Sequence, residues 1–281
     1  MDTTRREQGR NKVGGDFLKV NNVYNMDCIE GMKKIKDNTI DLTVTSPPYD
    51  NLRTYKGYSF DFKNIASQLY RITKKGGVVV WVVGDATING SETGTSFKQA
   101  LYFKKIGFNI YDTMIYKKKN IPVPSSNRYH QCFEYMFVFS NGKPNTFNSI
   151  EDRLNRTAGS VEKRKFRQKD GEIKKDDTKR KTKVFGMRTN IWEYVPGSFH
   201  SGKDNLVRNH PAVFPEKLVE DHIKSWSNRK DIVLDPMCGS GTTLVVANYL
   251  DRKYIGFDIS KEYVNLSKRR LKSRPTINKW M

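Results

Sequence analysis

The fold is decided by one stretch of the chain, Ile232-Val233-Leu234-Asp235-Pro236-Met237-Cys238-Gly239-Ser240-Gly241-Thr242-Thr243. Its apolar start predicts a buried strand, its two glycines predict a tight turn, and residues 243–250 predict a helix. Such a turn lets the backbone approach a ligand closely, with Thr242 and Thr243 available at the helix N-terminus. No lysine follows the last glycine, which argues against a P-loop, and the third glycine of the dinucleotide fingerprint is also missing.

A second acidic residue favours a ligand site at this turn. Residues 254–258 predict the next strand, and Asp258 ends it. A carboxylate in that place can accept hydrogen bonds from both hydroxyls of a ribose, as in nucleoside-cofactor sites of α/β proteins. A plain tight turn would explain the glycines, but it leaves Asp235 and Asp258 without a role. The unit therefore predicts a nucleoside-cofactor site.

Strand and helix patterns alternate outward from this unit. The helix expected at residue 96 would begin with a capping box, Ser96-Phe97-Lys98-Gln99. The alternation predicts an α/β fold with a doubly wound, mostly parallel sheet. Further strands are expected at 20–24, 40–44, 78–83, 111–116 and 134–139, and further helices at 29–35, 62–72, 96–107, 215–226 and 261–271.

The segment Thr45-Ser46-Pro47-Pro48-Tyr49 follows one of the expected buried strands. Ligands of open α/β sheets bind at the carboxyl ends of strands, so this segment should face the same crevice as the glycine turn. Its prolines stiffen the backbone and leave carbonyl oxygens as acceptors. The Ser46 hydroxyl and the Pro47 carbonyl could hold both N–H groups of an aryl amine, and Tyr49 could stack on a base taken out of the duplex. An ordinary Pro-Pro turn is the alternative.

The charge of the chain indicates the kind of partner. Lys and Arg number 51 against 30 Asp and Glu, a net charge of +21. This excess favours nucleic acid, although a solvated surface or an anionic membrane would also fit. No apolar run is long enough for a membrane span, and the polar N-terminus is unlike a signal peptide. The scattered Cys28, Cys132 and Cys238 predict reduced thiols in a cytoplasmic protein and no metal site.

Taken together, the two motifs resemble those of the β class of S-adenosylmethionine-dependent DNA amino-methyltransferases, in which the catalytic segment precedes the cofactor loop. The resemblance spans residues 20–271 except for a basic stretch. It implies a Rossmann-like methyltransferase of restriction-modification type that converts S-adenosylmethionine to S-adenosylhomocysteine, without a metal, and flips its target base. Members with Ser-Pro-Pro-Tyr mostly methylate cytosine N4, and those with Asp-Pro-Pro-Tyr mostly adenine N6. Ser46 therefore points to cytosine N4, with adenine N6 as the alternative.

The resemblance also implies site residues. The catalytic ones would be Ser46, Pro47, Pro48 and Tyr49. Asp27 would contact the adenine amino group of the cofactor, unless it only caps a helix, and residues 210–216 would pack against the methionine part. Met237 departs from the family, which commonly has Phe there, but a flexible Met can fill the same apolar slot. The cofactor-binding residues would be Asp27, Cys28, His210, Phe214, Asp235, Pro236, Met237, Gly239, Ser240, Gly241, Thr242 and Asp258.

DNA contacts are expected in basic segments. Residues 151–188 hold 14 Lys and Arg against 7 Asp and Glu, with no clean hydrophobic period, which indicates an insertion or a mobile loop. The resemblance places target recognition there, and it places residues 128–135 near the flipped base. A solvated loop remains an equal alternative for any single residue. The expected DNA-binding residues are Arg128, Lys163, Arg164, Lys165, Arg167, Lys179, Arg180 and Lys181.

The expected organisation is a flexible arm at 1–16, a catalytic half at 17–140, a basic insertion at 141–205 and a cofactor-binding half at 206–281. The implied partners are double-stranded DNA and, in a restriction-modification system, a cognate endonuclease. Monomer and homodimer both stay open. A C5-cytosine methyltransferase would need a cysteine after proline, and a zinc deaminase would need His-x-Glu with Pro-Cys-x-x-Cys; neither pattern occurs. RNA or protein methylation stays open, and a non-catalytic DNA-binding module would leave both motifs unexplained.

Overall fold

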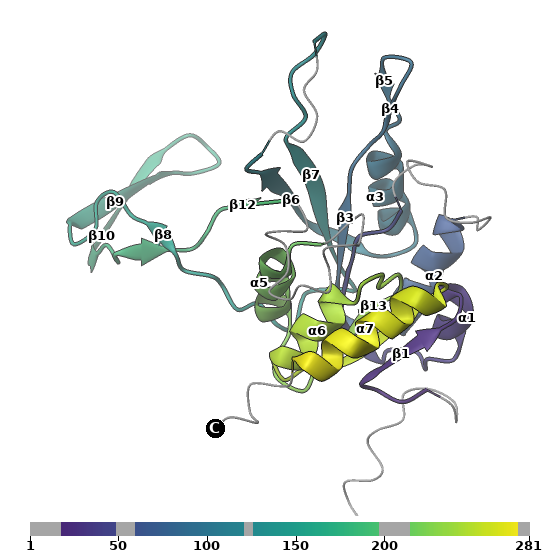
Figure 1. The fold of residues 1–281 in the computed structure, drawn as a ribbon. Coiled ribbons are helices and arrows are strands. Elements are labelled where there is room, and N and C mark those ends of the chain that lie inside the picture. Colours follow the sequence, from purple (N-terminus) through teal and green to yellow (C-terminus); the bar gives the residue numbers. More distant parts are fainter. Residues whose placement is uncertain (1–17, 49–59, 121–125, 197–213, 275–281) are drawn as a thin grey trace, which may run out of the picture. The chain divides into compact units, whose positions relative to one another are not determined.

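The computed structural model describes residues 18–48, 60–120, 126–196 and 214–274 (Figure 1). The expected arm at 1–16 and the predicted site residues Tyr49 and His210 lie outside these ranges. The chain divides into two compact units. One comprises Met1–Asn148 with Asn190–Met281, and the other comprises Ser149–Thr189.

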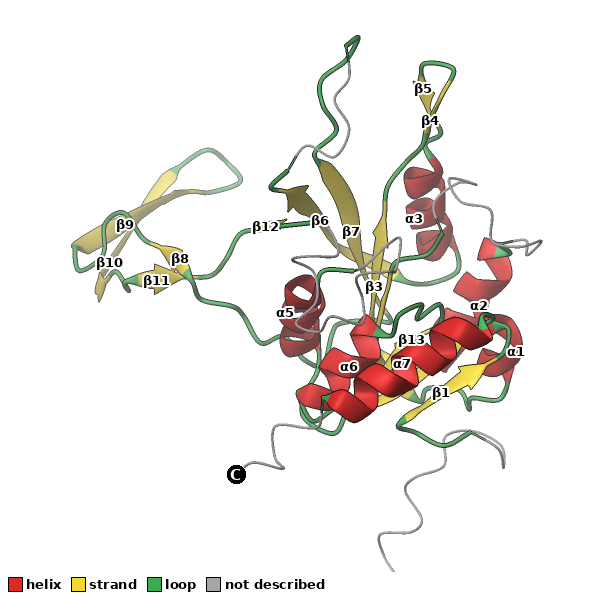
Figure 2. Ribbon diagram, in the orientation of Figure 1, coloured by secondary structure: helices red, strands yellow, loops and turns green. Residues whose placement is uncertain are grey.

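The larger unit is built on one eight-stranded sheet (Figure 2). Its strands are β1 (Asn22–Asn25), β2 (Ile40–Thr45), β3 (Thr73–Val83), β6 (Asn109–Lys118), β7 (Phe133–Ser140), β12 (Ile191–Tyr194), β13 (Ile232–Asp235) and β14 (Lys253–Asp258). They are ordered β1-β14-β13-β2-β3-β7-β6-β12. The first five of these are mutually parallel, β7 is antiparallel to both its neighbours, and β12 is parallel to β6. The mostly parallel sheet confirms the predicted fold class.

Helices form two packed series around this sheet. In the first, α1 (Cys28–Lys33) packs on α2 (Phe62–Ile72), which packs on α3 (Thr95–Lys105). In the second, α5 (Glu216–Trp226), α6 (Thr242–Tyr249) and α7 (Lys261–Ser273) pack in the same way. Val79, Trp81 and Val83 of β3 share a core cluster with the first series. The intervening residues Val78, Val80 and Val82 are buried as well. This continuous burial is what the apolar run at 78–83 predicts for a strand covered on both faces.

The capping box expected at residues 96–99 is wrong. The helix α3 begins at Thr95 after Gly94, and no side-chain cap hydrogen bond forms there. Asp85, which follows β3, accepts hydrogen bonds from the backbone N–H (2.9 Å) and the hydroxyl of Ser96. Gln99 accepts from the indole Nε1 of Trp81 at 2.8 Å. A carboxylate outside the helix thus satisfies its first turn, which a local sequence pattern does not reveal.

The smaller unit contains regular structure where the sequence indicates an irregular insertion. Its strand β8 (Arg153–Leu154) pairs with β11 (Phe185–Gly186), and β9 (Val161–Arg167) pairs antiparallel with β10 (Ile173–Lys181). Apolar residues in these strands, such as Leu154, Val161 and Ile173, are exposed. Because these apolar residues are exposed rather than buried on one face, they do not produce the alternation of apolar and polar residues that marks a half-buried strand. The boundaries 141–205 for target recognition stay a prediction, and β12 belongs to the larger sheet.

Candidate functional site

The carboxyl ends of β1, β14, β13 and β2 lie at one edge of the larger sheet, because these four strands are parallel neighbours. Asp258 ends β14, Asp235 ends β13 and Thr45 ends β2. The glycine turn and the Ser46 segment leave the sheet from this same edge, as predicted for ligands of open α/β sheets. A hydrogen bond of 2.8 Å from the Thr45 hydroxyl to Asp235 Oδ1 joins the two motifs directly.

Asp235 is a buried carboxylate that is hydrogen-bonded from both motifs. Its Oδ1 accepts from the Thr45 hydroxyl and from the backbone N–H of Met237 at 3.2 Å. The Thr243 hydroxyl of α6 lies close to it as well, but donates its one proton to the Val44 carbonyl at 3.2 Å. Burial nevertheless raises the pKa of Asp235 to about 6, and the negative charge of Asp258 acts in the same direction. The carboxyl therefore titrates close to neutral pH, which is characteristic of functional sites.

The glycine loop adopts a conformation that other residues rarely take. Gly239 and Gly241 have φ angles of 51° and 78°, in the left-handed region that favours glycine. A Cβ on Gly241 would also lie 2.5 Å from the hydroxyl oxygen of Ser267 in α7. That hydroxyl donates to the Gly239 carbonyl at 2.9 Å. The helix α7 thus fixes the loop from one side, and only a residue without a side chain fits at Gly241.

Asp258 holds the same loop from the neighbouring strand. Its Oδ2 accepts from the backbone N–H of Gly239, and its Oδ1 accepts from that of Ser260, both at 2.8 Å. Burial raises the pKa of Asp258, and these two hydrogen bonds oppose that shift. Each carboxylate oxygen can accept more than one hydrogen bond. Asp258 is therefore fixed in place and still able to accept from a ligand's hydroxyls.

A buried arginine braces the loop from behind. Arg270 of α7 is fully buried, and its Nη1 donates to the Ser240 carbonyl at 2.7 Å and to the Thr242 hydroxyl at 3.1 Å. Its Nη2 pairs with Glu216 Oε1 at 3.1 Å, and Arg274 binds the other Glu216 oxygen at 2.6 Å. A buried charge needs such partners to offset its desolvation. The network connects the start of α5 to the glycine loop.

Asp27 lies near the same edge as the cap of α1. Its Oδ1 accepts from the backbone N–H groups of Ile29 (2.8 Å) and Glu30 (3.2 Å). The strand β1 places it there, because Asn25 pairs with Asp258 in the parallel register. Asp27 therefore caps α1, which is the alternative that the sequence offered to a contact with the cofactor. The two roles are compatible, since a carboxylate has acceptor capacity beyond these bonds.

The two cysteines near the site are buried thiols. Burial raises the pKa of Cys28 to about 12, and the charge of Asp27 adds to this effect. Burial also raises the pKa of Cys238 well above its ordinary value. Because the thiolate is the nucleophilic form of cysteine, neither residue is suited to covalent catalysis.

The Ser46 segment starts from a fixed strand. Between β13 and β3, β2 is buried nearly throughout, and the Thr243 hydroxyl donates to the Val44 carbonyl at 3.2 Å. Pro47 is buried, whereas Ser46 and Pro48 are half-buried. The backbone that presents Ser46 is therefore held by hydrogen bonds up to the residue before it.

The remaining predicted cofactor residues flank this arrangement. Pro236 is buried, and the half-buried Met237 packs against the hydrophobic core cluster. Phe214 is half-buried and comes shortly before α5. Their contacts with a cofactor stay predictions, as does the role of His210.

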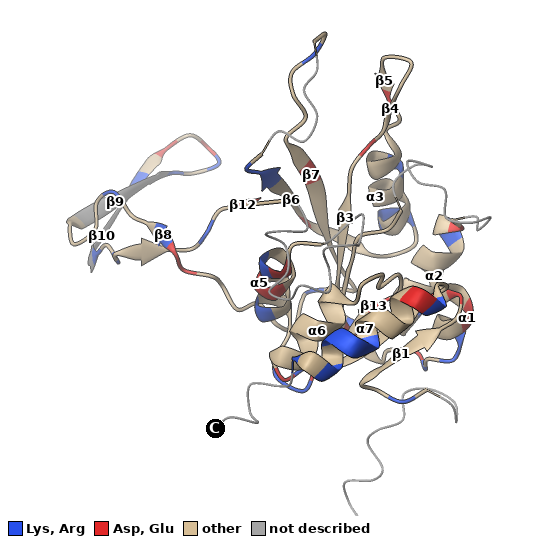
Figure 3. Ribbon diagram, in the orientation of Figure 1, with Lys and Arg blue, Asp and Glu red and all other residues tan. Residues whose placement is uncertain are grey.

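The predicted DNA-binding residues occur in both units. Arg128 is exposed, and it donates to the Gly90 carbonyl (2.8 Å) and the Thr87 hydroxyl (3.3 Å) of the hairpin formed by β4 (Thr87–Ile88) and β5 (Ser91–Glu92). Figure 3 shows Lys and Arg on helices of the larger unit as well as in the smaller one. The other expected residues belong to β9 and β10, where Arg167 and Lys181 are exposed. Their contacts with DNA stay predictions.

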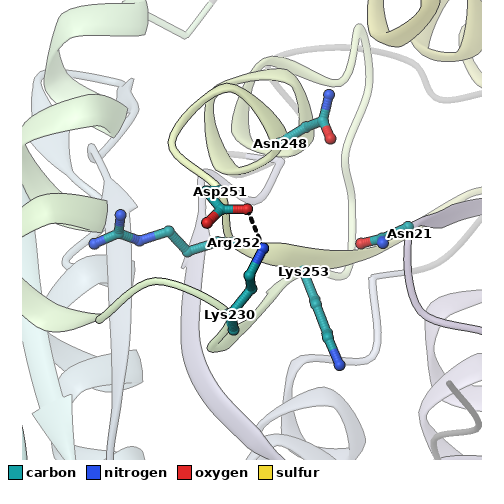
Figure 4. A pocket seen from close by; sticks show the side chains of 6 residues that line it. All are labelled: Asn21, Lys230, Asn248, Asp251, Arg252 and Lys253. Atoms are coloured by element: carbon teal, nitrogen blue, oxygen red, sulfur yellow. Dashed lines mark hydrogen bonds and ion pairs between the residues drawn. The ribbon is translucent and has the colours of Figure 1, made fainter. Parts of the chain in front are cut away.

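A pocket lies at the opposite edge of the sheet (Figure 4). Lys253 begins β14 and Lys230 precedes β13, so the pocket is at the amino ends of strands whose carboxyl ends form the site. Asp251 pairs there with Lys230 at 2.5 Å and with Arg229 at 2.9 Å. The pocket is lined by Asn21, Lys230, Asn248, Asp251, Arg252 and Lys253. These residues are remote from both motifs.

Metal-ligating clusters and membrane-spanning helices are both absent from the described part of the chain. The described residues contain no group of three or more His, Cys, Asp or Glu side chains placed to hold a metal ion. Within the same residues, no helix is long and apolar enough to cross a membrane.

Sequence reasoning missed the polar residues that hold the site together. Thr45 and Thr243 belong to the two predicted motifs, but the sequence assigns neither of them a role in joining the Ser46 segment to the glycine loop. It gives no sign of Arg270, which holds the loop at Ser240. The Arg270 contact joins α7 to the loop and depends on how the helices pack, which the sequence does not show.

Comparisons with known proteins point to one family. A family model described as DNA methylase, for N6 and N4 enzymes, matches residues 40–269. The chain is 55% identical over 251 residues to the orphan methyltransferase M.BamHII of Bacillus amyloliquefaciens. The matched region covers 89% of this chain and 95% of the relative. It is 29% identical over 263 residues to the type II methyltransferase M.HpaI of Haemophilus parainfluenzae, covering 88% and 73%.

Solved structures share the fold. The PvuII DNA methyltransferase (cytosine-N4-specific) matches with a TM-score of 0.65 and 20% identity, covering 88% of this chain and 85% of that one. The TTHA0409 modification methylase of Thermus thermophilus, solved with S-adenosyl-L-methionine, matches with a TM-score of 0.62 and 22% identity, covering 90% and 94%. At this level of identity the likeness concerns the fold.

Replacing Asp235 by Asn should raise stability at alkaline pH. The folded pKa of Asp235, about 6, lies above the value of about 3.9 expected in the unfolded chain. Its contribution to stability is therefore present at low pH and is lost as pH rises from about 4 through 6. Asn keeps an acceptor for the Thr45 hydroxyl without the charge. We expect the variant to exceed the native chain by on the order of 2 kcal/mol at about pH 8, measured by urea denaturation.

The control is Glu262→Gln, which neutralises an exposed acid of α7. The stability difference of each variant from the native chain is measured at about pH 4 and about pH 8, and only that of Asp235→Asn is expected to grow with pH. An Asp235→Asn difference that is equally flat would show that the carboxyl does not titrate in this range.

Proposed function

Since the chain belongs to the DNA methylase family, we propose that it moves a methyl group from S-adenosylmethionine to the N4 amine of cytosine in double-stranded DNA. The observation that carries this proposal is the contact between the two motifs. The Thr45 hydroxyl binds Asp235 at 2.8 Å, so the Ser46 segment and the glycine loop leave the sheet side by side. A methyl transfer needs a donor and an acceptor in such proximity.

The residues at this edge fit S-adenosylmethionine, which supplies an electrophilic methyl group on its sulfonium when bound. Asp258 is fixed by two backbone N–H groups and keeps acceptor capacity for ribose hydroxyls. Asp27 accepts two backbone N–H groups through Oδ1, and as a carboxylate it has acceptor capacity beyond these bonds for the adenine amino group. The glycine loop, with Gly239 and Gly241 in the left-handed region, allows close approach of the backbone to the ligand.

The Ser46 segment would prepare the amine of the base. An amine on an aromatic ring is a poor nucleophile, because its lone pair is delocalised into the ring. The Ser46 hydroxyl and the Pro47 carbonyl would accept from its two N–H groups and favour a pyramidal nitrogen. That nitrogen would form a bond to the methyl carbon as the carbon–sulfur bond breaks, which would leave S-adenosylhomocysteine, and the nitrogen would release one proton to water. The raised pKa values of Cys28 and Cys238 support a transfer without a covalent enzyme intermediate.

The target base can be identified directly. Unmethylated DNA is incubated with the protein and S-adenosylmethionine, digested to nucleosides and separated by mass spectrometry. We expect N4-methylcytosine, because Ser46 stands where the adenine-specific members mostly have Asp. If N6-methyladenine is found instead, the target base is adenine and the chain is still a DNA amino-methyltransferase. No methylated nucleoside from an active, folded preparation on DNA of varied sequence would contradict the proposal.

Replacing Ser46 by Ala should lower turnover far more than cofactor affinity. The change removes one of two acceptors for the amine, and comparable losses in preorganised sites reduce turnover on the order of a hundredfold. Binding of S-adenosylhomocysteine should change by less than about threefold, because the glycine loop and Asp258 are untouched. Single-turnover kinetics and calorimetry measure the two quantities. The matched control is Ser67→Ala on the exposed surface of α2, and equal losses of turnover and affinity would argue against the role of Ser46.

We also propose that the basic segments of the smaller unit bind DNA phosphates. Changing Lys163, Arg164 and Lys165 to Gln should weaken DNA binding and reduce its dependence on salt. The slope of the logarithm of the binding constant against the logarithm of the salt concentration falls by about one for each phosphate that is no longer neutralised. The same change at Lys179, Arg180 and Lys181 should act similarly. The measurement is the dissociation constant at several salt concentrations.

The control for these DNA-binding variants removes three positive charges from the larger unit instead. Lys33, Lys34 and Lys36 are exposed near the amino end of β2, away from the Ser46 edge. Their replacement by Gln lowers the net charge equally and should alter the salt slope less. If both series had the same effect, only the overall charge would matter and the smaller unit would hold no DNA site.

A further inference from the structure

Two threonine hydroxyls connect the end of β2 with the cofactor loop. Thr45, the last residue of β2, donates to Asp235 Oδ1 at 2.8 Å. Thr243, in the first turn of α6, donates to the Val44 carbonyl at 3.2 Å. Both threonines are fully buried. The two hydrogen bonds run in opposite directions, one from the Ser46 side and one from the glycine-loop side.

A third buried threonine, Thr43, provides a comparison for Thr45 on the same strand. Thr43 lies two residues before Thr45 on β2 and is just as fully buried. Among the described residues its hydroxyl has no hydrogen-bond partner, so within that part of the chain it does not contribute to the connection. Of these two buried hydroxyls of β2, that of Thr45 is the one that contacts the cofactor loop.

We infer that Thr45 and Thr243 are positioning residues, which set the distance and angle between the Ser46 segment and the glycine loop. This inference rests on the proposed function in that the two segments hold the methyl acceptor and the methyl donor. Ser46 immediately follows Thr45, so a shift of Thr45 is transmitted to it through one peptide bond. In-line transfer depends steeply on this alignment, since a displacement of about 1 Å can cost a hundredfold in rate.

The chemistry of the acceptor makes the Thr45 bond strong. A hydrogen bond to a charged, buried carboxylate is about twice as strong as one between neutral groups. The titratable groups that act on Asp235 are Asp258 at the end of β14 and Cys238 in the loop. Asp258 disfavours a negative charge on Asp235, whereas the hydrogen bond from the Thr45 hydroxyl favours it. The Cys238 thiol carries no charge, because Asp235 and burial raise its own pKa well above its ordinary value. Loss of the Thr45 hydroxyl should therefore raise the pKa of Asp235.

The test compares Thr45→Val with Thr43→Val. Each replaces a fully buried hydroxyl by a methyl group of similar size on the same strand. We expect Thr45→Val to lower the single-turnover methylation rate by roughly tenfold or more. Its affinity for S-adenosylhomocysteine at about pH 8 should stay within about threefold of the native value. Thr43→Val should keep the native rate, because no hydrogen bond is removed. Thr45→Ser keeps the donor and should recover most of the rate.

The pH profile separates positioning from general destabilisation. Because Asp235 acts on the Ser46 segment through the Thr45 hydroxyl, the fall in rate that protonation of Asp235 causes at acidic pH should disappear in Thr45→Val and persist in Thr43→Val. A loss of folded protein alone would lower the amplitude without removing this pH dependence, and thermal unfolding of each variant measures that loss. Thr243→Val removes the hydrogen bond that runs from α6 to β2. It should also lower the methylation rate and leave the affinity for S-adenosylhomocysteine nearly unchanged.

The inference is overturned if Thr45→Val and Thr43→Val have equal rates, or if Thr45→Ser fails to recover activity while remaining folded. The proposed function fails on a different result, namely that the native chain methylates no base. Methylation of adenine by the native chain would change the target base and leave the roles of Thr45 and Thr243 intact.

Discussion

Parallel pairing of β2 with β13 is the constraint on which the site depends. The register places Leu42 beside Val233 and Thr43 beside Leu234, so both strands end at the same edge. Their ends carry the Ser46 segment and the glycine loop, which are far apart in sequence. An antiparallel pairing would send the two loops to opposite edges. The order of the motifs along the chain therefore matters little, because the sheet restores their proximity.

Polar groups, rather than apolar packing, set the conformation of the loops that leave this edge. Asp235, Asp258 and Arg270 are each held by hydrogen bonds to backbone or side-chain atoms of the glycine loop or its flanks. Buried charges of this kind are weak evidence for stability, since well-packed apolar groups of similar size often stabilise a fold equally well. The raised pKa of Asp235 shows that burial works against its charge. Their retention at one edge is better explained by the need for a fixed, polar loop beside a ligand.

The sequence predicted the parts of the fold that have a periodic pattern. The runs at 78–83 and 232–235 are strands because both faces of the sheet are covered, and continuous apolar runs mark such strands. The hairpins of the smaller unit were missed, because strands with exposed apolar residues such as Val161 and Ile173 show no alternation. The helix start at Thr95 was misplaced by one residue, since Asp85 satisfies it from another element. The first error arises because the strands lack a periodic pattern, and the second because a group from a distant part of the chain replaces a local pattern.

The same distinction applies to the site, and it suggests how chemistry and DNA selection are divided. The motif residues at the loops were visible because glycines, prolines and aspartates are informative by type. The residues that join the loops act across sequence distance, so only the folded sheet reveals them. The smaller unit is inserted between segments that the larger unit holds firmly: Asn148 donates to the Ser225 carbonyl, and Ile115 donates to that of Asn190. With both ends fixed in this way, the inserted segment can change in length and charge without moving β2 or β13. If the smaller unit binds DNA as proposed, its DNA contacts can vary while the geometry of the site at the ends of β2 and β13 is preserved.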